Sequence, residues 1–314
     1  MVVNSARTLD WALIKEPLVR HLRPENSSQS VIMDALDLTI NMRGYGWNWS
    51  HGLYVPPETR PKNRIAFVFY TFLSVVVHVF VLGITYQANV SFSCAGPTAK
   101  KPIIFDDTLP FVLQYLRVGI MTAVMGVMGY SGLQMYYDLS TIVGVVIFRQ
   151  DPAQWPPALD APWRATSLID FWSHRWHQWA RGFFLFLGGY PLSLFLGRAG
   201  IILGAFLASA VLHDMFTLAI DSKSKSWGVF TAFAMMAPGM LAERAFYRLT
   251  GKRVGGVVGW VWTMIWLLTW NSLLLDGSAK VLLVGNSIPF QGVVPFGALV
   301  ERVVIDFDAW LHTI

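Results

Sequence analysis

Charged side chains are scarce in this sequence. Asp, Glu, Lys and Arg make up 14% of the 314 residues, whereas 54% of the residues are hydrophobic and the mean hydropathy is +0.47. Soluble domains carry about 25% charged residues. The deficit therefore excludes an ordinary soluble globular domain and predicts a protein embedded in a membrane.

Cysteine is rare in this sequence, and internal repeats and an early apolar run are missing. The single cysteine, Cys94, excludes an internal disulfide framework and a zinc site built on cysteine. The absence of a repeat of fixed period argues against a transporter made of duplicated halves. Residues 1–63 contain no membrane-length apolar run, and the first 20 residues lack the apolar core of a cleavable signal. We therefore expect a polar N-terminal segment over 1–63 and a membrane domain over 64–314.

Beyond residue 63 the sequence has apolar blocks long enough to cross a bilayer, which takes about 20 residues of helix. The clearest block covers residues 65–86. The other blocks are 111–130 with a short partner at 141–148, 183–197, 201–220, 227–241, 256–275 and 281–300. Together they predict an all-α integral membrane protein, a polytopic bundle of about seven or eight transmembrane helices.

The basic residues that give the net charge of +5 are clustered. The clusters are Arg60/Lys62/Arg64, Lys100/Lys101 and Arg244/Arg248/Lys252/Arg253. Such clusters are typical of cytosolic helix ends, and nothing interleaves them in the way expected of a nucleic-acid-binding surface. We therefore exclude nucleic acid as a partner and expect a multi-pass protein of the endoplasmic reticulum, inserted through residues 65–86.

A polar connection interrupts the apolar blocks at residues 149–166. Its four prolines rule out a regular helix. Ser167 and Asp170 then resemble a capping box and predict a helix that starts at Ser167. Continued at about 100° per residue to Arg181, this helix separates its side chains into two faces. One face carries Asp170, His174, His177 and Arg181, and the other carries Trp172, Trp176 and Trp179. An interfacial amphipathic helix explains the tryptophans well, but it explains the two histidines less well.

A further histidine, His213, lies inside the apolar block 201–220. Ionisable residues at membrane depth are costly and are therefore functional candidates. Ser209 and Thr217, at i−4 and i+4, predict a stripe of hydroxyls on either side of the imidazole. A neutral imidazole in an apolar cavity is a suitable general base, which contributes about 10²- to 10⁴-fold to a rate.

The residues alone leave two other readings open. Asp170, His174 and His177 could hold one zinc ion, although the seven mostly isolated histidines argue against a diiron centre. A channel or transporter could instead use the polar residues of the apolar blocks. These residues are Arg117, His213, Asp214, Asn271 and Asp276. Transport gives no role to the proline-rich connection or to the Trp/His segment.

Two stretches resemble a known family. Residues 155–181, WPPALDAPWRATSLIDFWSHRWHQWAR, resemble the signature of wax-synthase-like members of the membrane-bound O-acyltransferase superfamily. Residues 43–49, RGYGWNW, are similar to an upstream motif of fungal members. The resemblance covers about residues 43–275. It implies a helix bundle around a substrate tunnel.

The resemblance also implies roles for individual residues. His213 matches the intramembrane catalytic base. His177, 36 positions earlier, occupies the Asn/His position that orients or polarises the thioester carbonyl. Arg175, Trp176, Gln178 and Asp170 match motif positions and are expected, with Asn271, to contribute to substrate binding. Ser173 and His174 depart from the glycine and basic residue of many relatives, so His174 receives no catalytic role.

The implied reaction is an acyl transfer from acyl-CoA to a lipophilic alcohol that arrives from the bilayer, with no metal and no other cofactor. The fungal branch favours acetyl-CoA and a terpenoid or meroterpenoid hydroxyl, which would make the chain an O-acetyltransferase of secondary metabolism. A long-chain-alcohol O-fatty-acyltransferase (wax synthase) is the alternative within the family. A membrane transporter or channel is the alternative of another class.

Overall fold

The computed structural model describes residues 8, 11–12, 16–22, 30–50, 52–94, 105–220, 227–275 and 296–314. Within these residues the regular structure is helical, apart from one isolated antiparallel bridge between Arg20 and Trp47. The chain forms two compact units, which we describe separately. Unit 1 comprises Met1–Val68, Thr141–Ser209 and Met236–Thr263, and unit 2 comprises Phe69–Ser140, Ala210–Met235 and Met264–Ile314.

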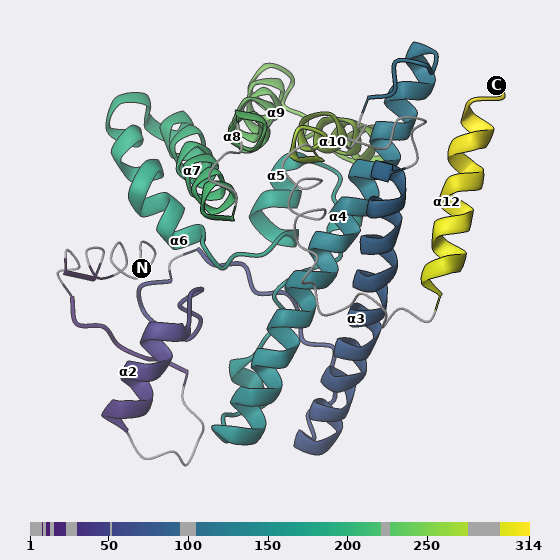
Figure 1. The fold of residues 1–314 in the computed structure, drawn as a ribbon. Helices are drawn as coiled ribbons and strands as arrows, with labels where there is room; N and C mark the ends of the chain where they lie inside the picture. The colour runs from purple at the N-terminus through teal and green to yellow at the C-terminus, as the bar shows by residue number, and fades with distance from the viewer. Residues whose placement is uncertain are drawn as a thin grey trace. The chain divides into compact units, whose positions relative to one another are not determined.

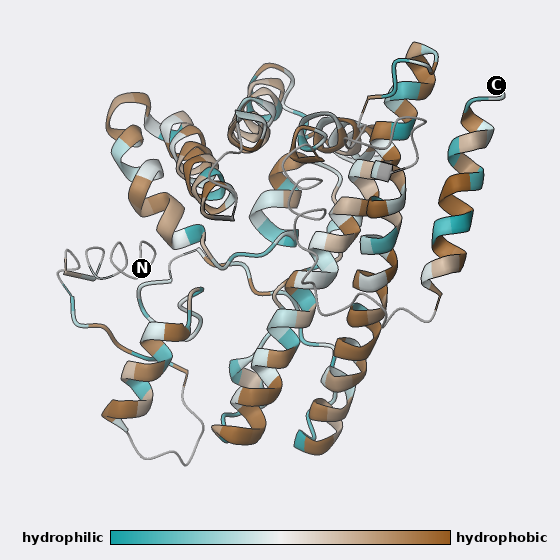
Figure 2. Ribbon diagram, in the orientation of Figure 1, coloured by the Kyte–Doolittle hydropathy of each residue, from teal (hydrophilic) through white to brown (hydrophobic). Residues whose placement is uncertain are grey.

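In the described part of the chain, three helical stretches are long and apolar enough to cross a membrane. They cover Arg64–Ser93, Phe111–Ile147 and Arg181–Ala219. The first is α3 (Arg64–Cys94), which confirms the helix expected at residues 65–86. The second contains α4 (Phe111–Ile142). Hydrophobic residues cover most of α3 and α4 (Figure 2), as expected for helices in contact with lipid. The expected seven or eight spans are not confirmed.

The separate short helix expected at residues 141–148 does not exist. This stretch continues α4 as a π-helix, η1 (Val143–Ile147), because Ile142 keeps helical backbone angles of φ −60° and ψ −47°. The helix ends at Phe148, whose N–H donates to the carbonyl oxygen of Val143.

The third apolar stretch is folded back on itself. It contains α6 (Arg181–Phe184), the π-helix η5 (Leu185–Gly189) and α7 (Tyr190–Ile220), and it reverses at Gly197, where φ is 56° and ψ is −137°. A Cβ on Gly188 would lie 2.0 Å from the carbonyl oxygen of Gly204. The arms therefore touch through their backbones in this hairpin (Figure 1) and match the two blocks expected at 183–197 and 201–220.

The block expected at residues 227–241 is divided into α8 (Trp227–Ala234) and α9 (Met236–Thr250). Pro238 has no N–H for the carbonyl of Ala234, and its ring opposes a continuous helix at that point. The next block, 256–275, contains α10 (Gly256–Asn271). Residues 281–295 of the last expected block lie outside the described residues, as does Asp276, and the described chain resumes with α12 (Gly297–Leu311).

Unit 2 has an apolar core crossed by one buried ion pair. The core residues are Ala88, Phe92, Val118, Met121, Leu275 and Val304. Arg117 lies 2.6 Å from Asp308 through its Nε, and the side chains of both residues are almost completely buried. The same guanidinium donates to the carbonyl oxygen of Phe92. The transport hypothesis placed Arg117 along a polar path. In the structure Arg117 connects α3, α4 and α12.

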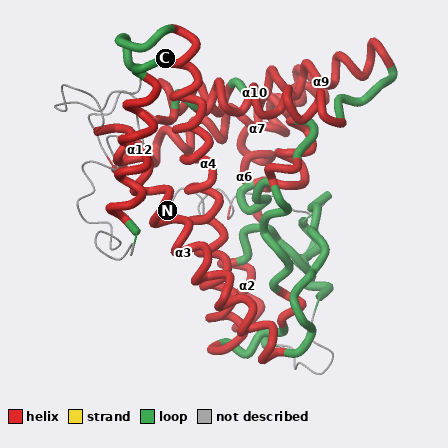
Figure 3. Tube along the Cα trace, turned by 90° about the vertical axis from the view of Figure 1, so that its right-hand side faces the viewer, coloured by secondary structure: helices red, strands yellow, loops and turns green. Residues whose placement is uncertain are grey.

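In unit 1 the N-terminal segment is tied to the proline-rich connection. Arg43 donates to the carbonyl oxygens of Pro156 and Pro157 at 2.9 and 2.8 Å. Tyr54 donates to the carboxylate of Asp160 at 3.0 Å. Figure 3 shows the loops of this unit between α2 (Val31–Ile40) and α6. The boundary at residue 63 stays a prediction.

Candidate functional site

The motif segment, residues 155–181, begins irregularly and becomes helical at Ser167. Short 3₁₀ turns lie at Pro152–Gln154 and Pro162–Arg164, so the prolines exclude a regular helix as predicted. The Ser167 hydroxyl accepts the N–H of Asp170 at 2.9 Å, which confirms the helix start. After the α-turn α5 (Leu168–Asp170), the chain widens into the π-helix η4 (Phe171–Arg175).

Glu243 of α9 accepts hydrogen bonds from the first backbone N–H groups of this helix. Its carboxylate accepts the N–H groups of Leu168 at 2.6 Å and Ile169 at 3.0 Å, and the indole N–H of Trp262 at 3.0 Å. The side chain is buried, and burial raises the pKa of Glu243 although the three donors oppose this shift. The sequence reasoning missed Glu243. The available signal was a lone acidic residue at the edge of an apolar run, beside the basic cluster.

The predicted helix from Asp170 to Arg181 is wrong beyond Arg175. Trp176 is extended, with φ −80° and ψ 156°, and α6 begins only at Arg181. The Arg175 carbonyl oxygen accepts the N–H of Asp160 at 2.9 Å instead of continuing a helix. His177 therefore does not share a helix face with Asp170.

Gln178 stabilises the end of the π-helix. Its side-chain NH₂ donates to the carbonyl oxygens of Trp172 at 2.9 Å and Trp176 at 3.1 Å. The residue is only 5% exposed, and its side-chain oxygen is buried without a hydrogen-bond partner among the described residues. The amide thus fixes the backbone on the N-terminal side of His177.

Arg175 and Asp170, both predicted as substrate-binding residues, bind each other. The Nε of Arg175 lies 2.6 Å from an Asp170 carboxylate oxygen, and its NH1 donates to the carbonyl oxygen of Asp160. The hydrogen bond to Asp170 raises the pKa of Arg175 further. The guanidinium is therefore always charged and joins the motif helix to the proline-rich connection.

The tryptophans and His177 form a packed aromatic group. Trp176 stacks on Phe171 with 5.4 Å between ring centroids, and Trp172 contacts Phe206 of α7 edge-on at 5.3 Å. The His177 ring lies 5.6 Å from Trp176 and 5.3 Å from Trp179. Its Nδ1 is buried. Trp176 thus contacts neighbouring rings, and His177 is placed by aromatic packing.

His174 is set apart from His177. Its side chain is 47% exposed, with its Nδ1 3.5 Å from Asp170 and its ring edge-on to Tyr54. Among the residues that the structure describes, no group of three His, Cys, Asp or Glu side chains could hold a metal ion. A zinc ion on Asp170, His174 and His177 is therefore not supported, because the chain leaves the helix between the two histidines.

His213 belongs to unit 2, whereas His177 belongs to unit 1. The His213 ring is part-buried in α7 and stacks on Phe233 of α8, with centroids 3.7 Å apart and planes at 21°. The Thr217 hydroxyl donates to the backbone carbonyl of His213 at 3.0 Å. In a helix such a hydroxyl commonly reaches the carbonyl one turn earlier, and the predicted stripe of hydroxyls beside the imidazole stays a prediction. Asn271 is the last residue of α10, in unit 2, and is part-buried.

Comparisons with known proteins agree with the resemblance seen in the motif. Residues 155–235, which include both His177 and His213, match the profile of the membrane bound O-acyl transferase family. O-Mevalon transferase yanI of Aspergillus niger is 31% identical over 47% of this chain and 34% of its own length. Acetyltransferase spyB of Aspergillus fumigatus is 25% identical over 69% of this chain and 42% of its own length.

A plant protein is also similar. The probable long-chain-alcohol O-fatty-acyltransferase 6 of Arabidopsis thaliana is 27% identical over 39% of this chain and 38% of its own length. The matches to these three relatives span about a third to two fifths of each relative's length. No solved structure matches the chain significantly. The resemblance to the fungal acetyltransferase and wax-synthase-like branch of the membrane-bound O-acyltransferases is confirmed.

Proposed function

We propose that this chain is an acyl-CoA-dependent O-acyltransferase that acetylates a hydroxyl of a lipophilic acceptor, such as a terpenoid or meroterpenoid. The observation that carries the proposal is the family match over residues 155–235, which contains the motif segment and His213. Two further relatives, ple2 of Rhodocybe pseudopiperita and TRI7 of Fusarium sporotrichioides, are also named acetyltransferases, and each aligns with about three quarters of this chain.

In the proposed mechanism, His213 accepts the proton of the acceptor hydroxyl as its oxygen attacks the thioester carbonyl. The new C–O bond forms, the C–S bond breaks, and the proton passes from the imidazole to the leaving thiolate, giving ester and CoA. The apolar stack on Phe233 supports this role, because it fixes the ring plane and keeps water from one face.

His177 polarises the thioester carbonyl by donating a hydrogen bond to its oxygen. Fixed donors of this kind are most effective when they are held in place before the reaction. The support for this role is the surrounding structure, in which Gln178 fixes the backbone before His177, and Trp176 and Trp179 flank its ring.

The remaining parts of the proposal follow from the family. The chain would form part of a bundle of about seven or eight transmembrane helices around a tunnel. Acyl-CoA would be the co-substrate, with no metal and no other cofactor. The protein would lie in the membrane of the endoplasmic reticulum, where the acceptor arrives through the bilayer.

The deciding experiment incubates microsomes that contain the protein with labelled acetyl-CoA or palmitoyl-CoA and a panel of terpenoid and fatty alcohols. We expect a labelled ester from acetyl-CoA and a terpenoid alcohol. Labelled ester from palmitoyl-CoA and a fatty alcohol would establish the wax-synthase alternative. No labelled ester from either donor would contradict acyl transfer and favour the transporter or channel.

A further inference from the structure

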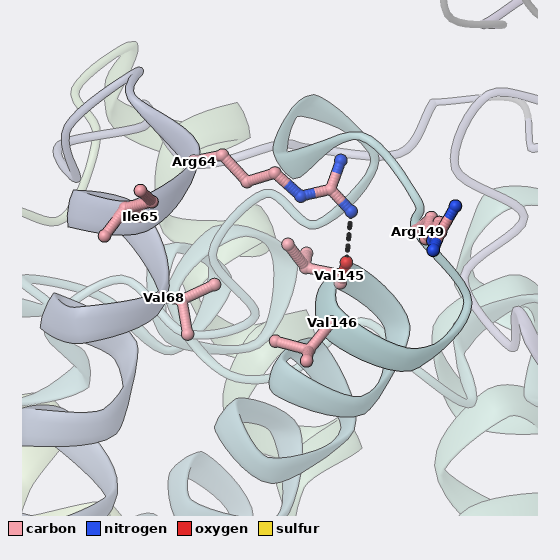
Figure 4. Close-up of a pocket in the computed structure, with 6 residues that line it drawn as sticks. All are labelled: Arg64, Ile65, Val68, Val145, Val146 and Arg149. Carbon is pink, nitrogen blue, oxygen red and sulfur yellow. Dashed lines mark hydrogen bonds between the residues drawn. The ribbon is translucent and has the colours of Figure 1, made fainter.

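Unit 1 contains a hollow of about 390 Å³ at one end of two candidate membrane spans (Figure 4). It lies between the first turns of α3 and the last turn of η1. Its lining residues are Arg64, Ile65, Val68, Val145, Val146 and Arg149. The hollow therefore combines two guanidinium groups with four aliphatic side chains.

Arg64 is anchored at the rim of the hollow. Its NH2 donates to the carbonyl oxygen of Val145, one of the carbonyls that lack a partner at the end of a helix (Figure 4). A guanidinium has five N–H donors in a planar fork. The bond to Val145 thus fixes the position of the group and leaves other donors for a ligand.

Arg149 has an unusual backbone conformation. Its φ is +53°, in the left-handed region that residues with a Cβ rarely adopt. Such conformations are found disproportionately at functional sites, where the surrounding structure maintains them. The side chain lines the hollow on the loop that follows η1, and the residue is exposed.

Among the residues that the structure describes, no carboxylate pairs with the two arginines of the hollow. Within the described part of the chain, neither Arg64 nor Arg149 forms an ion pair with a carboxylate, whereas Arg60 nearby in sequence binds Glu58 at 2.7 Å. The nearest carboxylate in sequence to Arg149 is Asp151, which accepts the N–H of Ala153 at 2.8 Å. Two arginines that line one hollow without a carboxylate partner among the described residues are a typical site for a phosphate group.

Exposed apolar residues lie one or two positions from each of the two arginines in the sequence. Ile65 is 81% exposed and Ile147 is 66% exposed, and both lie on stretches apolar enough to cross a membrane. The hollow is thus placed where a lipid-facing surface gives way to charged groups, which is the level of the phosphates in a bilayer. A ligand that suits both parts carries a phosphate next to a hydrocarbon chain.

We propose that Arg64 and Arg149 bind the phosphate group of an anionic amphiphile at the membrane surface. Two sources share this chemistry, an anionic phospholipid and acyl-CoA. The acyl-CoA source rests on the proposed acyltransferase function, whereas the phospholipid source does not.

The test uses the purified full chain in nanodiscs and the variant Arg149→Gly. Glycine adopts a positive φ without strain, so this variant removes the guanidinium while favouring the native backbone, and its Tm should be unchanged or higher. Arg149→Lys retains the charge. Arg253→Gln is the matched control, because Arg253 lies over the ring of Tyr247 and does not line the hollow.

One arm measures by native mass spectrometry how much phosphatidic acid the protein retains from phosphatidylcholine nanodiscs that contain it. The second arm measures the Kd of CoA in nanodiscs of phosphatidylcholine alone. We expect Arg149→Gly to weaken binding about tenfold or more in one arm, since charge-assisted hydrogen bonds to phosphate are strong, and Arg149→Lys to restore most of it.

The arm that responds identifies the source of the phosphate. A loss in the phosphatidic acid arm assigns a phospholipid and leaves the acyl-transfer assay unaffected, whereas a loss in the CoA arm assigns the co-substrate. Wild-type behaviour of Arg149→Gly in both arms would overturn the proposal. An equal loss with Arg253→Gln would also overturn it, because the attraction would then be due to general surface charge. The labelled-donor assay tests the proposed function separately, because a missing ester product there would contradict acyl transfer.

Discussion

The motif segment and the helix that carries His213 hold their histidines in different ways. Around His177 the backbone is irregular and is fixed by polar side chains, among them Glu243 and Gln178. His213 lies within a regular helix, and its ring stacks on Phe233. Substitutions that act at a distance should therefore disturb the first histidine more than the second.

The largest effect should come from His213→Ala. Loss of a general base lowers a rate by about 10²- to 10⁴-fold, and the helix tolerates alanine well. We expect ester formation in microsomes to fall to the background while the protein remains inserted. Near-normal activity would contradict the proposed mechanism, and Asp214→Ala on the same helix is the control for a general disturbance of α7.

His177→Asn should have a smaller effect than His177→Ala. The asparagine side chain can still donate a hydrogen bond to the thioester carbonyl, whereas alanine cannot. We expect kcat of the asparagine variant to fall about tenfold and that of the alanine variant about 10²-fold or more, as for loss of an oxyanion donor. Equal rates for the two variants would mean that hydrogen bonding by residue 177 is unimportant.

Gln178→Leu tests whether His177 depends on its neighbours. The variant keeps the size of the side chain but loses both hydrogen bonds to the Trp172 and Trp176 carbonyls. We expect kcat to fall roughly tenfold, since small displacements of a reacting group are costly, with an unchanged circular dichroism spectrum. Gln134→Leu is the matched control, because it also loses one side-chain hydrogen bond but lies in unit 2. Equal losses in both variants would refute a specific positioning role.

Glu243→Gln should destabilise the protein by about 1–3 kcal/mol, because an NH₂ group replaces an acceptor that faces N–H donors. The pKa of Glu243 is raised in the folded protein, so the folded state keeps this proton to a higher pH than the unfolded chain. Its contribution to stability is therefore largest below the ordinary carboxyl pKa and decreases as the pH rises through the folded pKa. Tm measured against pH should show this decrease in the wild type, and a variant with the same slope would contradict the assignment.

The smallest effect should come from His174→Ala. The side chain is half-exposed, and its contact with Asp170 duplicates the stronger pairing of Asp170 with Arg175. Exposed pairs contribute about 0.2–1 kcal/mol. We expect ester formation within about twofold of the wild type. A loss comparable to that of His177→Ala would show that the two histidines act together.

Features that depend on neighbouring residues were predictable from the sequence. The apolar run at residues 65–86 became α3, and the blocks on either side of Gly197 became the two arms of the hairpin. Ser167 starts a helix as its capping pattern indicates. Each of these depends on burial of a continuous apolar run or on a bond between residues three positions apart.

The course of the chain after Arg175 could not be predicted in this way. Besides Ser167, the start of the helix is bound by Glu243, 75 positions from Leu168, and the carbonyl oxygen of Arg175 at its end accepts the N–H of Asp160. Neither partner is identifiable from helical periodicity, which assumes that every carbonyl is bonded within the helix. The faces derived at about 100° per residue were therefore correct only within the first turns. The roles of His177 and His213 stay predictions.

The π-helix η4 has a consequence for how the chain can be shortened. A π turn contains one residue more than an α turn closed by the same carbonyl. Deleting one residue between Phe171 and Arg175 would allow ordinary α-helical bonding, but it would rotate everything downstream by about 100°. The number of residues in this turn thus sets the direction in which the side chains after it point. A homologue with one residue fewer here would present a different side chain where this chain presents His177.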